Sequence, residues 1–339
     1  MTLPVLALPL GDQAGIGPEI ALKAALDQRV RAVCRPVLVG DRSALQWHAA
    51  ACGIVADIFS IPGFACAGST DGVEIIDLRQ FGEHPLRPGA IAAIHGQAAI
   101  DAAAMAIKGA MDGVVDAVVA CPQTELAIKQ AGIPFDGYPS FVARCTGTPV
   151  EDAFLMLCFD ETRIVHTTLH VGLKRAIELI THERLVRAME CTDRMLRGLG
   201  IIQPRIAVAG LNPHASEHGL FGNEEATTIA PAIAAARQAG IDVEGPFGAD
   251  TMFHKPGYDA FIVMYHDQGH LAAKLLATNR TAGMTIGTPI LFSSVAHGSA
   301  LDIAGQNKAS AEAVVEAVLR LAGAAARRPA SATPRTSGD

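Results

Sequence analysis

The sequence predicts an α/β protein with a largely parallel sheet and helices on its faces. Short β-rich runs alternate along the chain with longer, alanine-rich stretches of helical pattern. Half of the residues are hydrophobic and only 18% are charged, which provides enough apolar material for a large core. The 339 residues can form two domains of ordinary size, and the sequence contains no internal repeat.

The alternation can be followed from the N-terminal residues onward. The run VLALPL predicts a buried strand, and a helix follows it, since Pro18 suits a first helical turn and Glu19 lies near the positive helix end. The turn between them contains only two of the three glycines of a dinucleotide-binding fingerprint. Further strands are expected within 112–122, 163–166, 205–211 and 259–264, and further helices within 90–110, 224–240 and 310–326.

Charge and hydropathy restrict the class of partner. The net charge of -7 and the isoelectric point near 5.9 argue against nucleic acid or an anionic membrane, because both attract basic surfaces. The first residues lack a basic segment and are interrupted by Pro4 and Pro9, so no signal peptide is expected. No stretch approaches the ~18 apolar residues of a membrane span. The seven cysteines include no C-x-x-C pair and are expected to be reduced, which fits a cytoplasmic protein with a small-molecule substrate.

Histidine follows three of the predicted strands, where the sites of α/β proteins collect. The segments are TRIVHTTLH, LNPHASEHG and YHDQGHLAAK. Imidazole is a common zinc ligand, and three protein ligands with one open position form a catalytic site, so the pattern suggests a shared metal. The alternative is that these are ordinary surface or core histidines, because the chain has 12 of them. The i, i+4 spacing of His166 and His170 is weak support, because RIVH reads as strand.

The segment 293–310 is polar and contains glycine between two apolar runs. One interpretation is a capping turn before a helix, with Ser310 as the N-cap residue. The other interpretation is a loop that wraps a nucleotide. The residues by themselves leave both open.

Six motifs in register resemble the 4-hydroxythreonine-4-phosphate dehydrogenase (PdxA) family. They are GDQAGIGPE, AGIPFDGYPSF, LNPHASEHGLFG, GADTMF, YHDQG and VAHGSALDIAG. The resemblance implies a two-domain α/β/α fold of the isopropylmalate dehydrogenase type, with mostly parallel sheets and the active-site cleft between the domains. It also implies an NAD-dependent dehydrogenase that binds a divalent metal, usually zinc, and forms a homodimer with its site near the subunit boundary.

The resemblance also implies roles for individual residues. The expected metal ligands are His170, His214 and His266, whereas His166, His218 and His270 receive no role. Asp250 and Lys274 are expected to face the substrate. The proton acceptor is left open among Asp250, Asp267, Lys274 and a metal-bound water. The expected cofactor-binding residues are His297, Gly298, Ser299, Ala300, Asp302 and Asn212.

Positions that contact the substrate in the vitamin B6 enzymes of the family differ here. Tyr138 and Pro139 stand in place of a histidine and a threonine. Gly283 replaces an asparagine, and Phe292 replaces a phosphate-binding arginine. A phosphate needs charge-assisted donors, so these changes argue against a phosphorylated substrate. The expected substrate-binding residues are Tyr138, Pro139, Ser140, Lys274 and Phe292.

The motifs RIVHTTLH and HDQGHLAAKLL, among others, resemble a subgroup of the family, the terephthalate 1,2-cis-dihydrodiol dehydrogenases. This implies oxidative decarboxylation of a cyclic dihydrodiol dicarboxylate to protocatechuate, with Arg144 and Arg280 as candidate cations for the second carboxylate. The alternative is a 4-hydroxythreonine-4-phosphate or four-carbon sugar-acid phosphate dehydrogenase. A non-redox transferase would have no use for three histidines and an NAD-type loop, and a structural zinc site would be expected to contain cysteines.

The expected division of the chain is a discontinuous cofactor-loop domain and an inserted domain for metal, substrate and dimer contacts. The first comprises residues 1–131 and 294–325, and the second comprises residues 132–293. The last segment, 326–339, is non-periodic and rich in Pro, Ser and Thr, so it is expected to be a disordered tail.

Overall fold

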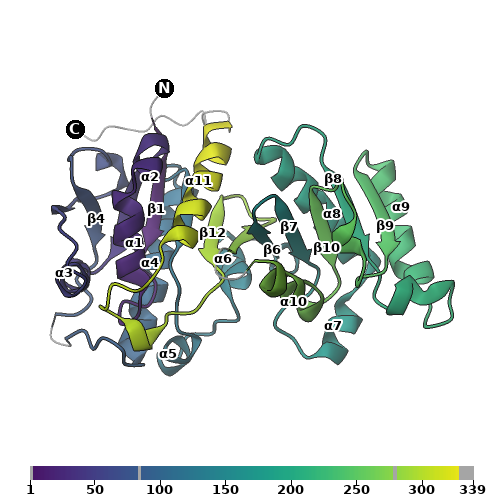
Figure 1. The fold of residues 1–339 in the computed structure, drawn as a ribbon, viewed down its shortest axis with the longest axis horizontal. Coiled ribbons are helices and arrows are strands. Elements are labelled where there is room, and N and C mark those ends of the chain that lie inside the picture. Colours follow the sequence, from purple (N-terminus) through teal and green to yellow (C-terminus); the bar gives the residue numbers. More distant parts are fainter. Residues whose placement is uncertain (1–2, 83–84, 278–280, 328–339) are drawn as a thin grey trace. The chain divides into compact units, whose positions relative to one another are not determined.

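The computed structural model describes residues 3–82, 85–277 and 281–327. The chain forms two compact units, traced in Figure 1. Unit 1 comprises residues 1–146 and 289–339, and unit 2 comprises residues 147–288. Unit 2 is therefore a continuous segment inserted into a discontinuous unit 1.

Unit 1 contains parallel strands in the order β3-β4-β2-β1-β5-β12. The strand order reverses at β1, from which β2 extends on one side and β5 on the other. The strands are short and mostly buried, as expected for a parallel sheet covered by helices. Their bounds are β1 (Val5–Pro9), β2 (Arg35–Gly40), β3 (Ile58–Ser60), β4 (Val73–Asp77), β5 (Ala117–Ala120) and β12 (Phe292–Val295).

Helices cover both faces of these strands. Val5 and Ala7 of β1 belong to the core beneath α4, whereas Leu6 and Leu8, equally buried, point to the other face. On that face α1, α2 and α11 pack against one another. The helices are α1 (Gly17–Leu26), α2 (Gln28–Val33), α3 (Arg42–Ala51), α4 (Ala93–Met111), α5 (Glu125–Gln130), α6 (Tyr138–Thr146) and α11 (Glu312–Arg327), with short turns η1 (Phe64–Cys66) and η6 (Leu301–Ile303).

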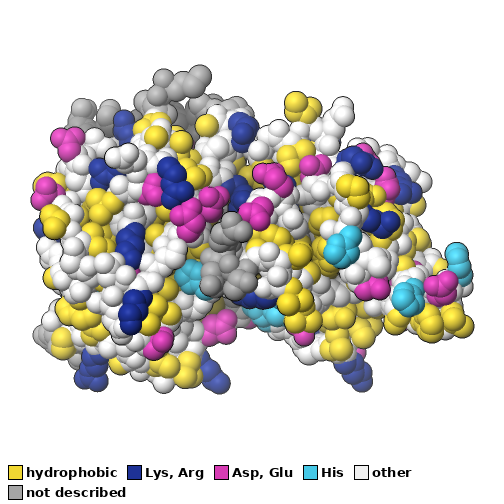
Figure 2. Space-filling model, in the orientation of Figure 1, with side chains coloured by type: hydrophobic (Ala, Val, Ile, Leu, Met, Phe, Trp, Pro, Cys, Tyr) yellow, Lys and Arg dark blue, Asp and Glu magenta, His cyan; other side chains and the backbone are white. Residues whose placement is uncertain are grey.

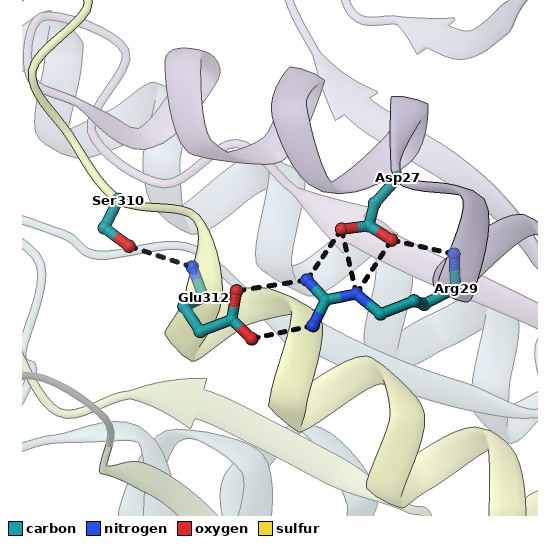
Figure 3. Close-up of polar contacts among 4 residues, drawn as sticks. All are labelled: Asp27, Arg29, Ser310 and Glu312. Carbon is teal, nitrogen blue, oxygen red and sulfur yellow. Dashed lines mark hydrogen bonds and ion pairs between the residues drawn. The ribbon is translucent and has the colours of Figure 1, made fainter.

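Arg29 ties α11 to the junction of α1 and α2 (Figure 3). Its guanidinium donates to Oδ2 of Asp27 at 2.8 Å and to Oε1 and Oε2 of Glu312 at 2.8 and 3.0 Å. The hydroxyl of Ser310 accepts from the backbone N–H of Glu312 at 3.3 Å. Ser310 therefore accepts a hydrogen bond from the first residue of α11, as a capping side chain does, but it lies one position before the N-cap position that we expect it to occupy.

Unit 2 contains strands in the order β11-β6-β7-β10-β8-β9. Strands β7, β10, β8 and β9 run parallel, whereas β6 is antiparallel to both β7 and β11. The β6–β7 connection is a tight turn in which Asp160 has a positive φ of 44°. The bounds are β6 (Phe154–Phe159), β7 (Thr162–His166), β8 (Arg205–Ala209), β9 (Asp242–Phe247), β10 (Ala260–Val263) and β11 (Ala282–Ile286).

The helices of unit 2 begin with recognisable signals. The hydroxyl of Thr181 accepts from the backbone N–H of Arg184 and caps α8. A π-helical turn, η4, leads into α9. The helices are α7 (Leu173–Leu179), α8 (His182–Gly198), α9 (Ala230–Gln238) and α10 (His266–Leu276), with short turns η2 (Val150–Asp152), η3 (Pro213–Glu217), η4 (Glu225–Ile229) and η5 (Met252–His254).

The predicted α/β class with mostly parallel strands is confirmed, and the antiparallel β6 is the exception. The compact units divide at 146/147 and 288/289, whereas we predicted 131/132 and 293/294. The difference at the first boundary arises because Tyr138, Phe141 and Val142 of α6 pack in the core beneath α4. Residues 326 and 327 belong to α11, and the rest of the predicted tail lies outside the described residues.

Figure 2 shows acidic and basic side chains interspersed on the visible face. Within the described residues, no helix is both long and apolar enough to cross a membrane. None of the seven cysteines forms a disulfide, and five of them are buried.

Candidate active site

The three predicted metal ligands follow neighbouring strands of unit 2. Strands β7, β10 and β8 lie side by side and run in one direction, so their carboxyl ends lie on one edge. His170 follows β7, His266 begins α10 after β10, and His214 follows β8. The prediction that these histidines follow strand ends is confirmed.

A pocket of about 380 Å³ lies at this edge. His170 and His266 both line it, and their ring centroids are 5.6 Å apart. The pocket is otherwise largely apolar, so a substrate with a hydrophobic body and polar ends suits it. Its remaining wall consists of Leu169, Val171, Leu173, Ala176, Tyr265 and Asp267.

The first turn of α10 orients His266. Oδ1 of Asp267 lies 2.6 Å from Nδ1 of His266. A carboxylate accepts the hydrogen at that nitrogen, which leaves the lone pair on Nε2 for a ligand. Gln268 accepts from the backbone N–H of Met264 at 2.8 Å and donates to the backbone oxygen of Gly210 at 3.0 Å. This amide joins the end of β10 to the loop that carries His214.

Two histidines without an expected role lie behind His266: His270 contacts His266, and His166 contacts His270. The ring of His270 stacks on that of His266, with centroids 3.7 Å apart and planes within 8°. Nδ1 of His270 lies 3.0 Å from Nε2 of His166. Burial, together with the nearby imidazoles, lowers the pKa of His166 to about 3 and that of His270 to about 4. The sequence signals only the neighbourhood of His266 and His270, through their i, i+4 spacing at the start of α10.

His214 lies in a left-handed turn. Residues 214–218 all have positive φ, from 44° to 71°, a conformation that costs an L-residue about 1–2 kcal/mol. The buried carboxylate of Glu225 holds the start of this turn, since its Oε1 accepts from the backbone N–H groups of Leu211 and Asn212, both at 2.7 Å. Such strain persists only where the surroundings enforce it, and it is typical of functional segments.

Asn212 and Asp250 flank the same turn. Nδ2 of Asn212 donates to Glu224 at 2.7 Å and to Glu225 at 2.9 Å, so both of its amide hydrogens are used within unit 2. Only its Oδ1 is left for the predicted cofactor contact. Asp250 follows β9 and is exposed. A Cβ on Gly248 would lie 2.8 Å from Oδ1 of Asp250 and 3.7 Å from Cα of His214, which places Asp250 beside the turn.

Lys274 continues the line of side chains on α10. His266, His270 and Lys274 follow one another at intervals of four residues and therefore lie on one face of the helix. Lys274 is exposed, and its charge contributes to the lowered pKa of His270. A cation thus lies on the same helix face as the pocket histidine.

The residues around the pocket fit part of a metal site. Two imidazoles bound to one ion at about 2.1 Å have centroids no farther apart than about 6.5 Å, and the pair of His170 and His266 meets this condition. In the described part of the chain, however, no group of three or more His, Cys, Asp or Glu is arranged to hold a metal. His170 and His266 would hold an ion, and His214 as the third ligand stays a prediction.

In unit 1, the predicted cofactor loop is held at the point where the strand order reverses. The loop follows β12, and the backbone oxygen of Ser299 accepts from the N–H of Ile16 at 2.9 Å. The hydroxyl of Thr124, just after β5, donates to that of Ser299 at 3.0 Å. A Cβ on Gly15 would lie 2.3 Å from the Ser299 oxygen, so only glycine allows this approach. Ligands of α/β sheets bind at such reversal points.

Part of this loop is exposed, and its role in binding a nucleotide stays a prediction. Gly298 is exposed and faces open space, His297 and Ala300 are half-buried, and Asp302 is exposed. These residues expose backbone and polar groups at the surface, while Ser299 is buried and anchors the loop. The loop is followed by Gly305, where a Cβ would lie 2.7 Å from the ring of Trp47.

The residues expected to bind substrate through α6 and β12 also lie in unit 1. The rings of Tyr138 and Phe292 are 4.9 Å apart. Phe292 is fully buried and Tyr138 is 6% exposed. Phe292 therefore shapes the packing behind Tyr138, which differs from the direct substrate contact we predicted for it. Pro139 is buried and Ser140 is half-buried.

The candidate cations for a second substrate carboxylate are Arg144 and Arg280, and the structure describes only the first of them. The guanidinium of Arg144 donates to Asp136 at 3.1 Å and to the backbone oxygen of Pro134 at 3.3 Å. It is therefore already engaged at the surface of unit 1. Arg280 lies outside the described residues.

The comparisons with known proteins all indicate the same family. The profile of the family described as pyridoxal phosphate biosynthetic protein PdxA matches residues 32–322. A 1,2-dihydroxy-3,5-cyclohexadiene-1,4-dicarboxylate dehydrogenase of Comamonas sp. is 38% identical over 321 residues, covering 93% of this chain and 96% of the relative. A protein of Clostridium botulinum, provisionally named D-threonate 4-phosphate dehydrogenase, is 37% identical over 320 residues, covering 93% and 95%.

Solved structures agree. A crystal structure of 4-hydroxythreonine-4-phosphate dehydrogenase from Klebsiella pneumoniae aligns with a TM-score of 0.82 and 34% identity, covering 94% of this chain and 99% of the other. These similarities extend over both units. The relation to isopropylmalate dehydrogenases stays a prediction.

Proposed function

This chain belongs to the PdxA family and is a dehydrogenase; on that premise we propose that it oxidises a cyclic cis-dihydrodiol dicarboxylate, terephthalate dihydrodiol, with NAD. The ring then loses carbon dioxide and becomes protocatechuate. The dicarboxylate has a flat apolar ring with charged ends, which suits the largely apolar pocket beside His170 and His266.

One observation carries the choice of a substrate without phosphate. At the positions where the vitamin B6 enzymes are expected to hold phosphate, the rings of Tyr138 and Phe292 pack together in the core. Burial raises the pKa of Tyr138, so its phenol stays neutral. A phosphate dianion needs charge-assisted donors, and these two side chains offer none.

The second candidate is a phosphorylated four-carbon acid, such as D-threonate 4-phosphate or 4-hydroxythreonine 4-phosphate. It is supported by relatives named for these activities at identities near that of the dihydrodiol enzyme, 37% against 38%. Identity at this level does not separate the two substrates. Both are hydroxy acids, so the same metal and cofactor residues would serve the oxidation of either, and the two candidates differ in what they require at Tyr138 and Phe292.

The reaction can be followed at the substrate atoms. The secondary alcohol loses its hydroxyl proton and, from carbon, a hydride that passes to the nicotinamide. The C–C bond to the neighbouring carboxylate of the resulting β-keto acid breaks, and carbon dioxide leaves. The electron pair of that bond passes to the ketone oxygen, which takes up a proton, and the ring becomes the aromatic diol. When bound at His170 and His266, a divalent metal, zinc by expectation, supplies Lewis-acid polarisation of the substrate oxygens.

We assign the remaining roles in the reaction to three side chains. Asp267 is engaged with Nδ1 of His266, so we assign it to the orientation of that ring. Lys274, on the same helix face, supplies a positive charge for the substrate carboxylate or for negative charge that develops on its oxygen. Asp250 is the exposed carboxylate beside the His214 turn, and it is our candidate for accepting the hydroxyl proton.

We further propose that the chain acts as a homodimer with the pocket near the subunit boundary. The helix that carries His266 exposes three leucines: Leu271 is 62% exposed, Leu275 is 85% exposed and Leu276 is 55% exposed. A cluster of this kind on one helix is typical of an interaction surface. Light scattering on the wild type and on Leu275→Lys tests the assignment, and a dimeric variant would contradict it.

The decisive experiment measures formation of NADH by the zinc-loaded protein with each substrate in parallel. We expect turnover of the dihydrodiol, release of carbon dioxide, and no turnover of the phosphate esters. Tyr138→Phe serves as a matched variant, because it keeps the aromatic ring and removes the hydroxyl oxygen, which is the only polar atom of that side chain. Turnover of a phosphate ester alone would refute the proposal and favour the second candidate.

A further inference from the structure

The pair of His166 and His270 lies directly behind His266, although neither residue belongs to the expected ligand set. His270 stacks on His266 with a centroid separation of 3.7 Å and nearly parallel planes. His270 also meets His166 through a contact of 3.0 Å between Nδ1 and Nε2. His166 is the last residue of β7 and is fully buried. The stack on His266 is thus connected to a rigid strand.

The hydrogen positions in this pair follow from its surroundings. Nδ1 of His270 lies 3.3 Å from the backbone oxygen of His266 as well as near His166. A carbonyl oxygen only accepts, so Nδ1 of His270 carries the hydrogen and Nε2 of His166 accepts. The connection is therefore a directed hydrogen bond from α10 to β7.

The close contact between α10 and β7 depends on Gly269. A Cβ at this position would lie 2.3 Å from Nε2 of His166 and 2.9 Å from Cγ2 of Ile164. The helix can reach His166 only because the residue before His270 has no side chain. Gly269 and the two histidines therefore form one arrangement.

We propose that His166 and His270 are positioning residues that fix the ring plane of His266 toward the pocket. Asp267 selects which nitrogen of His266 is available, and the stack with His270 decides where that nitrogen points. Ring orientation matters because a ligand bond has a preferred direction, and residues behind metal ligands commonly change affinity about 10- to 100-fold. The proposal rests on the proposed function in so far as His266 serves as a ligand.

The first measurement concerns the metal-free protein. In wild type, the ring signals of His266 in a histidine-labelled nuclear magnetic resonance spectrum should report a single Nδ1–H tautomer with a ring-current shift from His270. His270→Ala should abolish that shift, whereas His254→Ala, at an exposed position of unit 2, should leave it unchanged. An unchanged His266 signal in folded His270→Ala would overturn the proposal.

The second measurement is zinc affinity by competition with a chromophoric chelator. We expect His270→Ala to bind zinc about tenfold or more weakly, and His270→Phe, which keeps a flat ring but not the hydrogen bond, to lie in between. Affinity of His270→Ala within twofold of wild type would also overturn the proposal. If His270→Ala does not fold, His270→Leu, which keeps an apolar side chain of similar size but has no ring, decides by the same two criteria. If wild type binds no zinc while the His266 signal still depends on His270, the positioning role stands and the metal role in the proposed function fails.

Discussion

Replacing Gly269 by alanine tests the packing of α10 on β7. The new methyl group would lie 2.3 Å from Nε2 and 2.8 Å from Cε1 of His166. These are ring atoms of a fully buried side chain rather than the end of a flexible one. The ring cannot move away without breaking its hydrogen bond to His270, so the helix has to shift.

The expected change in the free energy of unfolding combines opposing effects. Alanine in place of a helical glycine gains about 1 kcal/mol. Overpacking of a buried site costs about 1–3 kcal/mol, and loss of the hydrogen bond between His166 and His270 costs about 1 kcal/mol more. The net expectation is a destabilisation of about 1–3 kcal/mol.

Gly198 provides a matched control, because it ends α8 with open space where its Cβ would lie. Gly198→Ala should raise stability by about 0.4–1 kcal/mol. The assay is equilibrium urea unfolding of both variants and wild type, followed by far-ultraviolet circular dichroism. If Gly269→Ala proves as stable as Gly198→Ala, the close packing of α10 on β7 is refuted.

Three further predictions concern other parts of the molecule. Burial lowers the pKa of His48, so below pH ~6.5 the unfolded chain takes up a proton that the folded chain does not, and the free energy of unfolding falls by up to about 1.4 kcal/mol per pH unit. His48→Gln should reduce the dependence of this free energy on pH, measured by urea unfolding, while His254→Gln leaves it unchanged. The same pH dependence in both variants would contradict the reasoning. Glu225→Ala leaves two backbone N–H groups without their acceptor and should cost about 2–3 kcal/mol, with faster amide exchange over the His214 turn; unchanged exchange would show that other contacts hold the turn. Thr124→Val removes the hydrogen bond to Ser299 in the predicted cofactor loop. It should weaken NADH binding about fivefold, or about 1 kcal/mol, at unchanged melting temperature. An unaltered dissociation constant would argue against that loop as the cofactor site.

The positions of the candidate ligands were predictable because they depend on strand order and direction. A buried apolar run followed by histidine places that histidine at the carboxyl end of a strand, and parallel strands share that edge. This reasoning holds for His170, His214 and His266. It also extends to the loop around Ser299, where the sequence showed polar residues between apolar runs.

What the sequence did not reveal depends on geometry within and between elements. His166 ends a strand, and its contact with His270 follows from how α10 packs on β7, which residue spacing alone does not specify. The left-handed turn at His214 has no glycine in its first residues, so no local preference predicts it, and the distant Glu225 enforces it. The burial of Phe292 likewise depends on α6 joining the core of unit 1.

Trp47 is the only tryptophan in the chain, and it lies beside Gly305, a few residues after the cofactor loop. Intrinsic tryptophan fluorescence of this protein is therefore a signal from unit 1 alone, because unit 2 contains no tryptophan. Because reduced nicotinamide absorbs where tryptophan emits, energy transfer from Trp47 offers a direct measure of cofactor occupancy that needs no turnover. Circular dichroism reports on both units. Comparing the unfolding curve from tryptophan emission with that from circular dichroism therefore reveals whether the two units lose their structure together or one after the other.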